Sequence, residues 1–153
     1  FQSGIWWAIQ ATQFFGKVMK ERERGSIINT CSMYAVIVPS PDLYEGTDRF
    51  NPPGYSMAKA GLLQFTKYSA AFLAPHVRVN AISPGVFPIP SDESSPNAID
   101  VDNPVLLRLK KKILLERMGH PNDLIGALLY LASPASSYVT GFNMMIDGGI
   151  SIT

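Results

Sequence analysis

One long helical segment between two short β-rich runs constrains the fold of this chain most strongly. The segment Pro53 to Leu73 follows the run Ser26 to Cys31 and precedes the run Val77 to Ile82. Short apolar runs bounded by glycine and proline are typical of buried strands, and a strand, helix, strand order is typical of a right-handed crossover within a parallel sheet. The sequence therefore predicts an α/β fold in which strands alternate with helices.

Tyr55 and Lys59 lie four residues apart near the start of this predicted helix, so their side chains share one face. A positive charge beside a phenol favours the phenolate and lowers the tyrosine pKa from about 10 toward working pH, as a general acid/base requires. By itself, such a pair is more often a solvated tyrosine beside a surface lysine. Its setting favours a site, because small residues would let a ligand or another backbone approach closely: Ser56, Ala58, Ala60 and Gly61.

Ser32 and the turn Ser83-Pro84-Gly85 fall at one edge of the predicted sheet, because each directly follows a predicted strand. Parallel sheets bind their ligands at the carboxyl ends of their strands. We therefore expect both segments to lie beside the helix start that carries Tyr55.

Two proline-rich and acidic connections flank this edge. Residues Met33 to Pro53 form the first, with four prolines and the acids Asp42, Glu45 and Asp48. Long ordered loops are often functional, so this connection is either a wall of a substrate pocket or a surface excursion without a role. Residues Val86 to Asn103 form the second connection, which is a candidate mobile lid over the site.

The remaining segments predict three further helices and one further strand. Gly4 to Glu21 is a helix with apolar residues on more than one side, which indicates burial against the sheet and against a second subunit. Helices are also expected from Pro104 to Glu116 and from Asn122 to Ala132, and a last short strand from Asn143 to Ile146.

Composition narrows the classes of function. A hydrophobic content of 46%, a charged content of 16% and a net charge of +1 predict one soluble globular domain over residues 1–153. No basic patch with interleaved aromatic residues is present, so a nucleic-acid partner is not expected. The cluster Arg108 to Lys112 is interpreted as the solvated side of a helix that packs through Leu107, Leu109, Ile113 and Leu114.

A few residues bear on the cellular compartment of the protein and on whether it binds a metal. The N-terminal apolar stretch is interrupted by Gln and Lys, so neither a membrane span nor a secretory signal is expected there. Cys31 is the only cysteine, which fits a reducing, cytoplasmic location, and it is best interpreted as a small buried hydrophobe. His76 and His120 lie too far apart for metal-ligand spacing.

Several short motifs, taken together, resemble the short-chain dehydrogenase/reductase family. They are Asn-x-x-Ser ending at Ser32, Tyr-x-x-x-Lys from Tyr55 to Lys59, Asn-x-x-x-Pro-Gly ending at Gly85, then Arg-x-Gly-x-Pro, Thr-Gly and Asp-Gly-Gly. The match covers nearly the whole chain and corresponds to the C-terminal half of that family's nicotinamide-dependent Rossmann-like fold. The resemblance implies an oxidoreductase that interconverts an alcohol and a carbonyl.

The same resemblance implies roles for individual residues. Tyr55 matches the catalytic acid/base, and Lys59 matches the residue that lowers the tyrosine pKa and hydrogen-bonds the nicotinamide ribose. Ser32 matches the residue that holds the substrate oxygen. Cofactor binding to NAD or NADP would involve Tyr55, Lys59 and the turn formed by Pro84, Gly85 and Phe87. The segment Tyr44 to Thr47 resembles a branch of the family that acts on sugar-type substrates.

The sequence departs from the family pattern at three places. The phosphate-binding glycine loop, the first four strands and the residue that selects NAD or NADP are not in this sequence, so we expect little or no activity from the 153-residue chain alone. Gly4 stands where the family has an Asn that supports a proton relay. Ile89 stands where a Thr commonly hydrogen-bonds the cofactor.

Two alternatives to a working oxidoreductase remain open. One is a truncated, inactive member that acts only as an oligomerisation or binding module. The other is a sequence that is part of a longer chain. In the family, the helices that correspond to Gly4 to Glu21 and Pro53 to Leu73 contact another subunit, so a homo-oligomer through these helices is expected.

Overall fold

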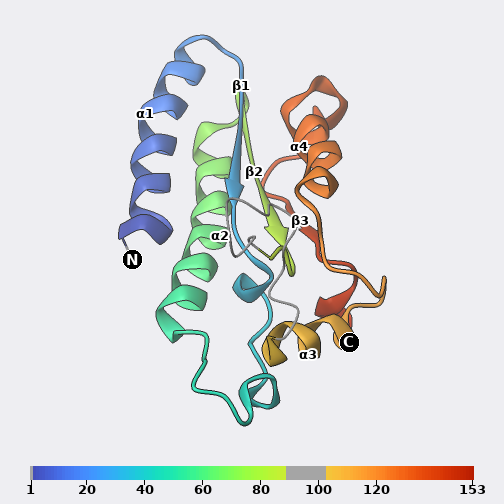
Figure 1. The fold of residues 1–153 in the computed structure, drawn as a ribbon. Helices are drawn as coiled ribbons and strands as arrows, with labels where there is room; N and C mark the ends of the chain where they lie inside the picture. The colour runs from blue at the N-terminus through green and yellow to red at the C-terminus, as the bar shows by residue number, and fades with distance from the viewer. Residues whose placement is uncertain (1, 89–102) are drawn as a thin grey trace, which may run out of the picture.

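A three-stranded parallel sheet organises the computed structural model, which describes residues 2–88 and 103–153. The strands are β1 (Gly25–Thr30), β2 (Val77–Pro84) and β3 (Asn143–Ile146), in the order β1-β2-β3 (Figure 1). Gly25 pairs with Val77, and Ala81 pairs with Asn143. The predicted α/β fold with a parallel sheet is therefore confirmed.

The strand boundaries differ slightly from the prediction. β1 both begins and ends one residue earlier than expected, so Cys31 lies just beyond it, and β2 continues two residues further because Ser83 and Pro84 pair with β3. β3 has the predicted bounds. The proposed lid, residues Val86 to Asn103, falls mostly outside the described residues, since 89–102 are not described.

The central helix α2 (Pro53–Leu73) has the predicted bounds. Pro53 occupies its first turn, where the missing N–H costs nothing, and Ala74 is already extended before Pro75. Its buried residues recur every three or four positions and face the sheet: Ala58, Leu62, Thr66, Ser69 and Ala70. Leu62 packs in one cluster with Cys31 and Ala81, and Ala70 packs with Val77 and Val79.

Helix α1 (Trp7–Glu21) lies beside α2 on one face of the sheet, and α4 (Ile125–Ala132) covers the opposite face (Figure 1). The predicted start of α1 at Gly4 is wrong, because residues Gln2–Trp6 form a π-helical turn. This turn packs closely on α2: a Cβ on Gly4 would lie 3.1 Å from Cβ of Ala58.

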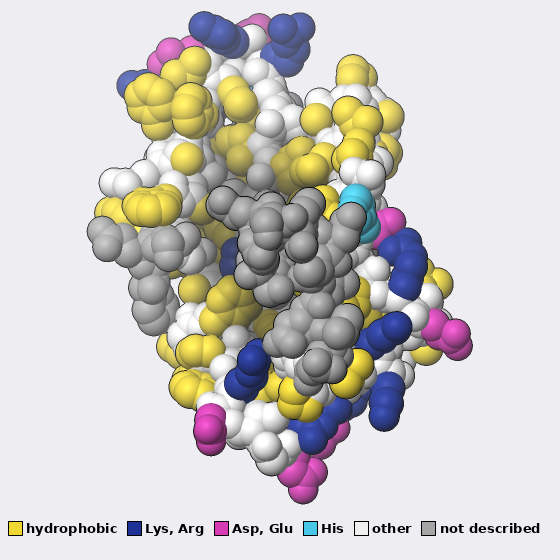
Figure 2. Space-filling view, viewed as in Figure 1, with side chains coloured by type: hydrophobic (Ala, Val, Ile, Leu, Met, Phe, Trp, Pro, Cys, Tyr) yellow, Lys and Arg dark blue, Asp and Glu magenta, His cyan; other side chains and the backbone are white. Residues whose placement is uncertain are grey.

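The outer side of α1 and α2 carries exposed aromatic residues. Exposure is 62% for Trp7, 68% for Phe14 and 61% for Phe72. Figure 2 shows hydrophobic side chains gathered over α1. As expected, α1 therefore carries apolar residues on its outer side as well as on the side that faces the rest of the fold. The second subunit that would cover the outer side stays a prediction. No helix in the described part of the chain is long and apolar enough to cross a membrane.

Helix α3 (Pro104–Lys112) ends four residues before the predicted Glu116. Ile113 is extended and buried, so the backbone leaves the helix to place this side chain in the core. The predicted packing side is half right, because Leu109 and Ile113 are buried whereas Leu107 and Leu114 are exposed.

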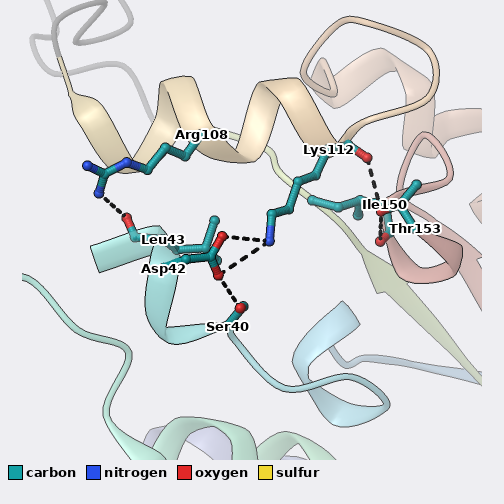
Figure 3. A network of polar contacts seen from close by, with 7 residues as sticks. All are labelled: Ser40, Asp42, Leu43, Arg108, Lys112, Ile150 and Thr153. Carbon is teal, nitrogen blue, oxygen red and sulfur yellow. Dashed lines mark hydrogen bonds and ion pairs between the residues drawn. The ribbon is translucent and has the colours of Figure 1, made fainter. Parts of the chain in front are cut away.

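The interpretation of Arg108 to Lys112 as a merely solvated side is wrong for its two ends. Arg108 Nη1 donates hydrogen bonds to the carbonyl oxygens of Leu43 (3.0 Å) and Glu45 (2.7 Å), and Lys112 forms an ion pair with Asp42 at 3.1 Å. Figure 3 shows the contact of Arg108 with Leu43 and that of Lys112 with Asp42. Thr153 Oγ1 also donates to the carbonyl of Lys112. These contacts fasten α3 to the 3₁₀ turn Pro41–Tyr44 and to the last residues of the chain.

Helix α4 is held to the sheet by Arg78 of β2. Its guanidinium donates to the carbonyl oxygens of Leu131 (3.0 Å) and Ser133 (3.2 Å) and to Ser136 Oγ (2.8 Å). A helix leaves its last carbonyl groups without partners, so a cation placed there satisfies them and complements the negative end of the helix dipole. A 3₁₀ turn, Pro121–Leu124, precedes α4, so the predicted helix start at Asn122 is three residues too early.

The turn before α4 is expected to open in acid. Arg117 holds Asp123 through two hydrogen bonds of 2.6 and 2.9 Å, and the amide of His120 donates to the same carboxylate at 2.8 Å. These contacts lower the pKa of Asp123 from 3.8 to about 2. Because the folded pKa is depressed, the stabilisation is present above pH 3.8 and is lost as the pH falls through about 2.

An NMR titration of the His120 amide checks this expectation. The shift should titrate with a midpoint near 2, and Asp123→Asn should remove the titration while the matched variant Glu116→Gln should not. A midpoint at the ordinary carboxyl value of about 4 would contradict the assigned contacts.

Candidate active site

The predicted catalytic residues lie at the carboxyl ends of β1 and β2. Ser32 follows β1, is 7% exposed and caps the 3₁₀ turn Met33–Ala35 by accepting a hydrogen bond from the amide of Tyr34 at 3.2 Å. Tyr55 lies in the first turn of α2, which packs against this turn. Its side chain is 43% exposed, so a ligand can reach the phenol.

Lys59 connects the two predicted catalytic segments. Its Nζ donates a hydrogen bond of 2.8 Å to the carbonyl oxygen of Thr30, the last residue of β1, and lies 5.9 Å from the centroid of the Tyr55 ring. A cation within about 6 Å of an aromatic ring is attracted to it. The structure therefore brings Tyr55 and Lys59 together beside the strand end that leads to Ser32. Lys59 is half-buried rather than buried.

The small residues around the pair have a packing role. Ala58 lies against Gly4, and a Cβ on Gly61 would approach Ile5 to 3.0 Å. At Ala58 the group that approaches closely is the backbone of Gly4, which is one of the two alternatives left open by the sequence, and at Gly61 it is the side chain of Ile5. Gly4 permits this contact, and the chain has no amide side chain there.

Cys31 is buried at the end of β1, as predicted. Burial raises the pKa of its thiol to about 11, against the smaller opposing effect of the nearby Lys59 charge. The thiolate is the nucleophilic form of cysteine, so this residue serves packing rather than chemistry at neutral pH. The described residues also hold no group of three or more His, Cys, Asp or Glu side chains that could bind a metal.

The turn after β2 needs glycine at Gly85. A Cβ there would lie 2.6 Å from Cα of Asp147, so no larger residue fits without moving the backbone. Asp147 in turn accepts hydrogen bonds from the amides of Gly149 (2.9 Å) and Ser151 (3.1 Å). The C-terminal Asp-Gly-Gly motif thus forms the support of the Pro84-Gly85 turn.

Phe87 lies further along the same segment, with its ring against Gly119. It lines a cavity of about 250 Å³ together with residues that include Arg117 and Asp123. Phe87 therefore packs against the Arg-x-Gly-x-Pro motif, which contains Arg117 and Gly119.

Sequence reasoning missed Tyr34 as a site residue. The pKa of its phenol is raised above the usual value by burial first, then by the phenols of Tyr44 and Tyr55. Tyr34 and Tyr44 line one cavity. The available signal was a tyrosine two residues after Ser32, but its position in the same cavity as Tyr44 was visible only in the fold.

The connection Met33 to Pro53 forms walls of two cavities, and neither of them is lined by Ser32, Tyr55 or Lys59, so both interpretations of the connection stay open. One cavity of about 590 Å³ lies between this connection and α3, and its polar lining includes Tyr34, Tyr44, Asp48 and Asn51. A second cavity of about 400 Å³ is lined largely by apolar residues from the same connection.

A family model and a curated relative both match most of this chain. A family model described as "Enoyl-(Acyl carrier protein) reductase" matches residues 6–151. An L-xylulose reductase from Hypocrea jecorina is 37% identical over 143 residues, which cover 94% of this chain and 45% of that protein.

Solved structures share the fold. A short-chain dehydrogenase from Leptospira borgpetersenii with bound NAD⁺ matches with a TM-score of 0.75 and 36% identity, over 94% of this chain and 52% of that one. An NADPH-dependent 3-quinuclidinone reductase from Rhodotorula rubra matches with a TM-score of 0.80 and 34% identity, over 98% and 51%. The chain therefore spans about half the length of these relatives.

Proposed function

The chain belongs to the short-chain dehydrogenase/reductase family, and we propose that it carries the catalytic half of an NAD- or NADP-dependent oxidoreductase that interconverts an alcohol and a carbonyl. The observation that carries the proposal is the position of Lys59, which binds the end of β1 and lies over the Tyr55 ring. A fixed cation, a solvent-accessible phenol and a nearby hydroxyl at the carboxyl end of a parallel sheet form a suitable set for this reaction.

The donor groups present fit a nicotinamide nucleotide. An ammonium group has three N–H donors, and Lys59 uses one on Thr30, which leaves two for the vicinal hydroxyls of a ribose. The Pro84-Gly85 turn offers backbone rather than side chains, so a flat ring can approach it. When bound, the nicotinamide ring would donate or accept the hydride.

The residues of this chain handle the substrate oxygen and its proton. The Tyr55 phenol gives a proton to the carbonyl oxygen in reduction, or takes one from the alcohol in oxidation. Ser32 Oγ donates a hydrogen bond to the same oxygen and orients it without competing for its proton. Lys59 supplies positive charge beside the phenol, with its Nζ 5.9 Å from the centroid of the ring.

A polyol or sugar is the proposed substrate class. The H. jecorina relative is named L-xylulose reductase, and the cavity beside Tyr34 has a polar lining. The test is a screen of polyols, ketoses and simple alcohols with each cofactor, by nicotinamide absorbance, on the protein expressed from its complete gene. Cofactor-dependent turnover of polyols or ketoses is expected, and turnover of none of these compounds would contradict the proposal.

Lys59→Met is expected to weaken cofactor binding, because it removes the N–H donors that would bind the ribose hydroxyls. Fluorescence titration with NADH and NADPH measures the effect. Lys67→Met, an exposed lysine of the same helix, is the matched control and should leave cofactor binding unchanged. Unchanged cofactor binding in Lys59→Met would mean that the lysine only fastens α2 to β1.

We also propose that the exposed aromatic side of α1 and α2 contacts another copy of the chain. The support is the exposure of Trp7, Phe14 and Phe72, which is unusual for large apolar residues that remain in water. Contact between copies would accompany catalysis rather than replace it.

A further inference from the structure

We propose that a cavity at the amino ends of β1 and β2 binds the phosphate group of a small molecule. The cavity has a volume of about 520 Å³ and lies between the starts of these strands and the end of α4, at the top of Figure 1. The predicted catalytic residues lie at the carboxyl ends of the same strands, so the cavity is not part of the proposed active site. Its polar lining consists of basic and hydroxyl side chains: Arg24, Ser26, His76, Arg78, Ser133 and Ser137.

Arg78 brings a positive charge to this cavity without a carboxylate to neutralise it. Its half-buried guanidinium donates to three carbonyl oxygens and to the hydroxyl of Ser136, and all of these acceptors are neutral. By contrast, Arg117 and Lys112 are each paired with an aspartate. The end of α4 offsets only about half of one positive charge. The guanidinium is therefore held in one place, and a net positive charge remains beside the cavity.

Arg24 and His76 add donors that have no partner in the described part of the chain. Neither side chain makes a hydrogen bond or an ion pair with the described residues. A guanidinium has five N–H donors, and an imidazole has one when neutral and two when protonated. Among the described residues that line the cavity there is no Asp or Glu. The cavity therefore offers free donors and positive charge, and its lining holds no carboxylate that would compete with an anion.

A phosphate group matches this set better than a carboxylate does. A phosphate monoester carries a charge of about −1.5 to −2 at neutral pH and three acceptor oxygens, whereas a carboxylate carries one charge and two oxygens. Arg24 and Arg78 bring two positive charges, and guanidinium groups bind phosphate oxygens through paired N–H donors. The volume lies within the range of pockets that bind small molecules and exceeds that of a phosphate group alone. We therefore assign a phosphate ester rather than free phosphate.

The test is an NMR titration of the protein expressed from its complete gene with glycerol 3-phosphate, in the absence of cofactor and alcohol substrate. The amide signals of Gly25 and Ser137 should shift with one common dissociation constant, because both residues line the cavity. Glycerol, which lacks the phosphate, should shift neither signal. Shifts confined to residues outside the cavity, or no shift at millimolar glycerol 3-phosphate, would overturn the inference.

Arg24→Met should raise this dissociation constant about threefold to tenfold, because it removes charge-assisted hydrogen bonds to the phosphate. Arg22→Met is the matched control: it removes the same charge from an exposed arginine two residues away that does not line the cavity, and it should leave the constant unchanged. Equal increases in the two variants would show that the overall charge of the protein, rather than this cavity, attracts the phosphate, and would refute the site.

His76 provides a second check within the cavity. His76→Leu removes its N–H donor and should raise the dissociation constant, whereas His76→Gln keeps a donor and should raise it less. The same constant in His76→Leu as in the wild type would contradict the assignment of this residue to the site.

Acetate tests the choice of phosphate over carboxylate. At matched ionic strength it should bind at least about tenfold more weakly than glycerol 3-phosphate, because it brings one charge and two oxygens. Equal dissociation constants for the two anions would refute the assignment of a phosphate group.

Discussion

Tyr55→Phe is expected to lower kcat by about 10²- to 10⁴-fold, because a positioned general acid/base contributes about that factor to proton transfer. Phe keeps the ring that lies 5.9 Å from Lys59 Nζ and removes only the hydroxyl that exchanges the proton. Tyr55 is 43% exposed, so the fold should be retained when its hydroxyl is lost. Initial rates of the purified variant measure the change in kcat, and its circular dichroism spectrum shows whether the fold is retained.

Tyr138→Phe provides the control for this substitution, because Tyr138 is fully exposed. It should leave both kcat and the circular dichroism spectrum unchanged. Turnover by Tyr55→Phe at the wild-type rate would show that another group moves the proton.

Arg78→Met is expected to lower the free energy of unfolding by about 3 kcal/mol, the largest stability effect that we predict. Arg78 donates to three carbonyl oxygens and one hydroxyl around the end of α4: those of Leu131, Ser133, Val139 and Ser136. Met keeps the apolar stem and removes the guanidinium, but each of the three carbonyls also accepts from Ser26, Ser136 or Asn80. The expected loss is therefore that of about one or two hydrogen bonds to a charged group, at about 1.5–3 kcal/mol each, rather than of four. The melting temperature should fall by roughly 6–12 °C in a thermal scan.

Arg24→Met is the matched control, because Arg24 is an exposed arginine near the same end of the sheet. It should change the melting temperature little. A melting temperature for Arg78→Met equal to that of the wild type would mean that water replaces the guanidinium at no cost.

The central strand–helix–strand unit was predictable because its signals are local. Proline in the first turn of α2 and proline just beyond its end mark both boundaries of the helix, and the structure confirms Pro53 and Leu73. β3 was equally clear, as a short apolar run closed by a turn of two glycines with positive φ, 64° at Gly148 and 87° at Gly149. The motifs that resemble the family also lie within such local segments.

Contacts between distant residues were not predictable from these signals. The partners of Arg108 and Lys112 lie 63 to 70 residues away in sequence. A helical pattern shows which side of α3 is charged, but it does not show which loop faces that side. The same holds for Tyr34 and Tyr44, which line one cavity together with residues of α3.

The candidate site was predicted in outline. The structure places Ser32, Tyr55 and Lys59 at the carboxyl ends of the strands, and it adds Thr30 as the group that anchors the lysine. The catalytic roles of these residues stay predictions. Ile89, which stands where the family commonly has a Thr, falls outside the described residues. Gly4, which stands where the family has an Asn, packs against Ala58 and offers no amide side chain.

Transfer of deuterium from a polyol carbon to the nicotinamide ring tests the central claim most directly. The protein expressed from its complete gene would be incubated with carbon-deuterated polyols and alcohols and with NAD⁺ or NADP⁺, and the cofactor would be analysed by mass spectrometry. We expect one deuterium in the reduced cofactor with the wild type, and transfer that is about 10²- to 10⁴-fold slower with Tyr55→Phe. A reduced cofactor without deuterium, or deuterium transfer that is equally fast in Tyr55→Phe, would contradict the account.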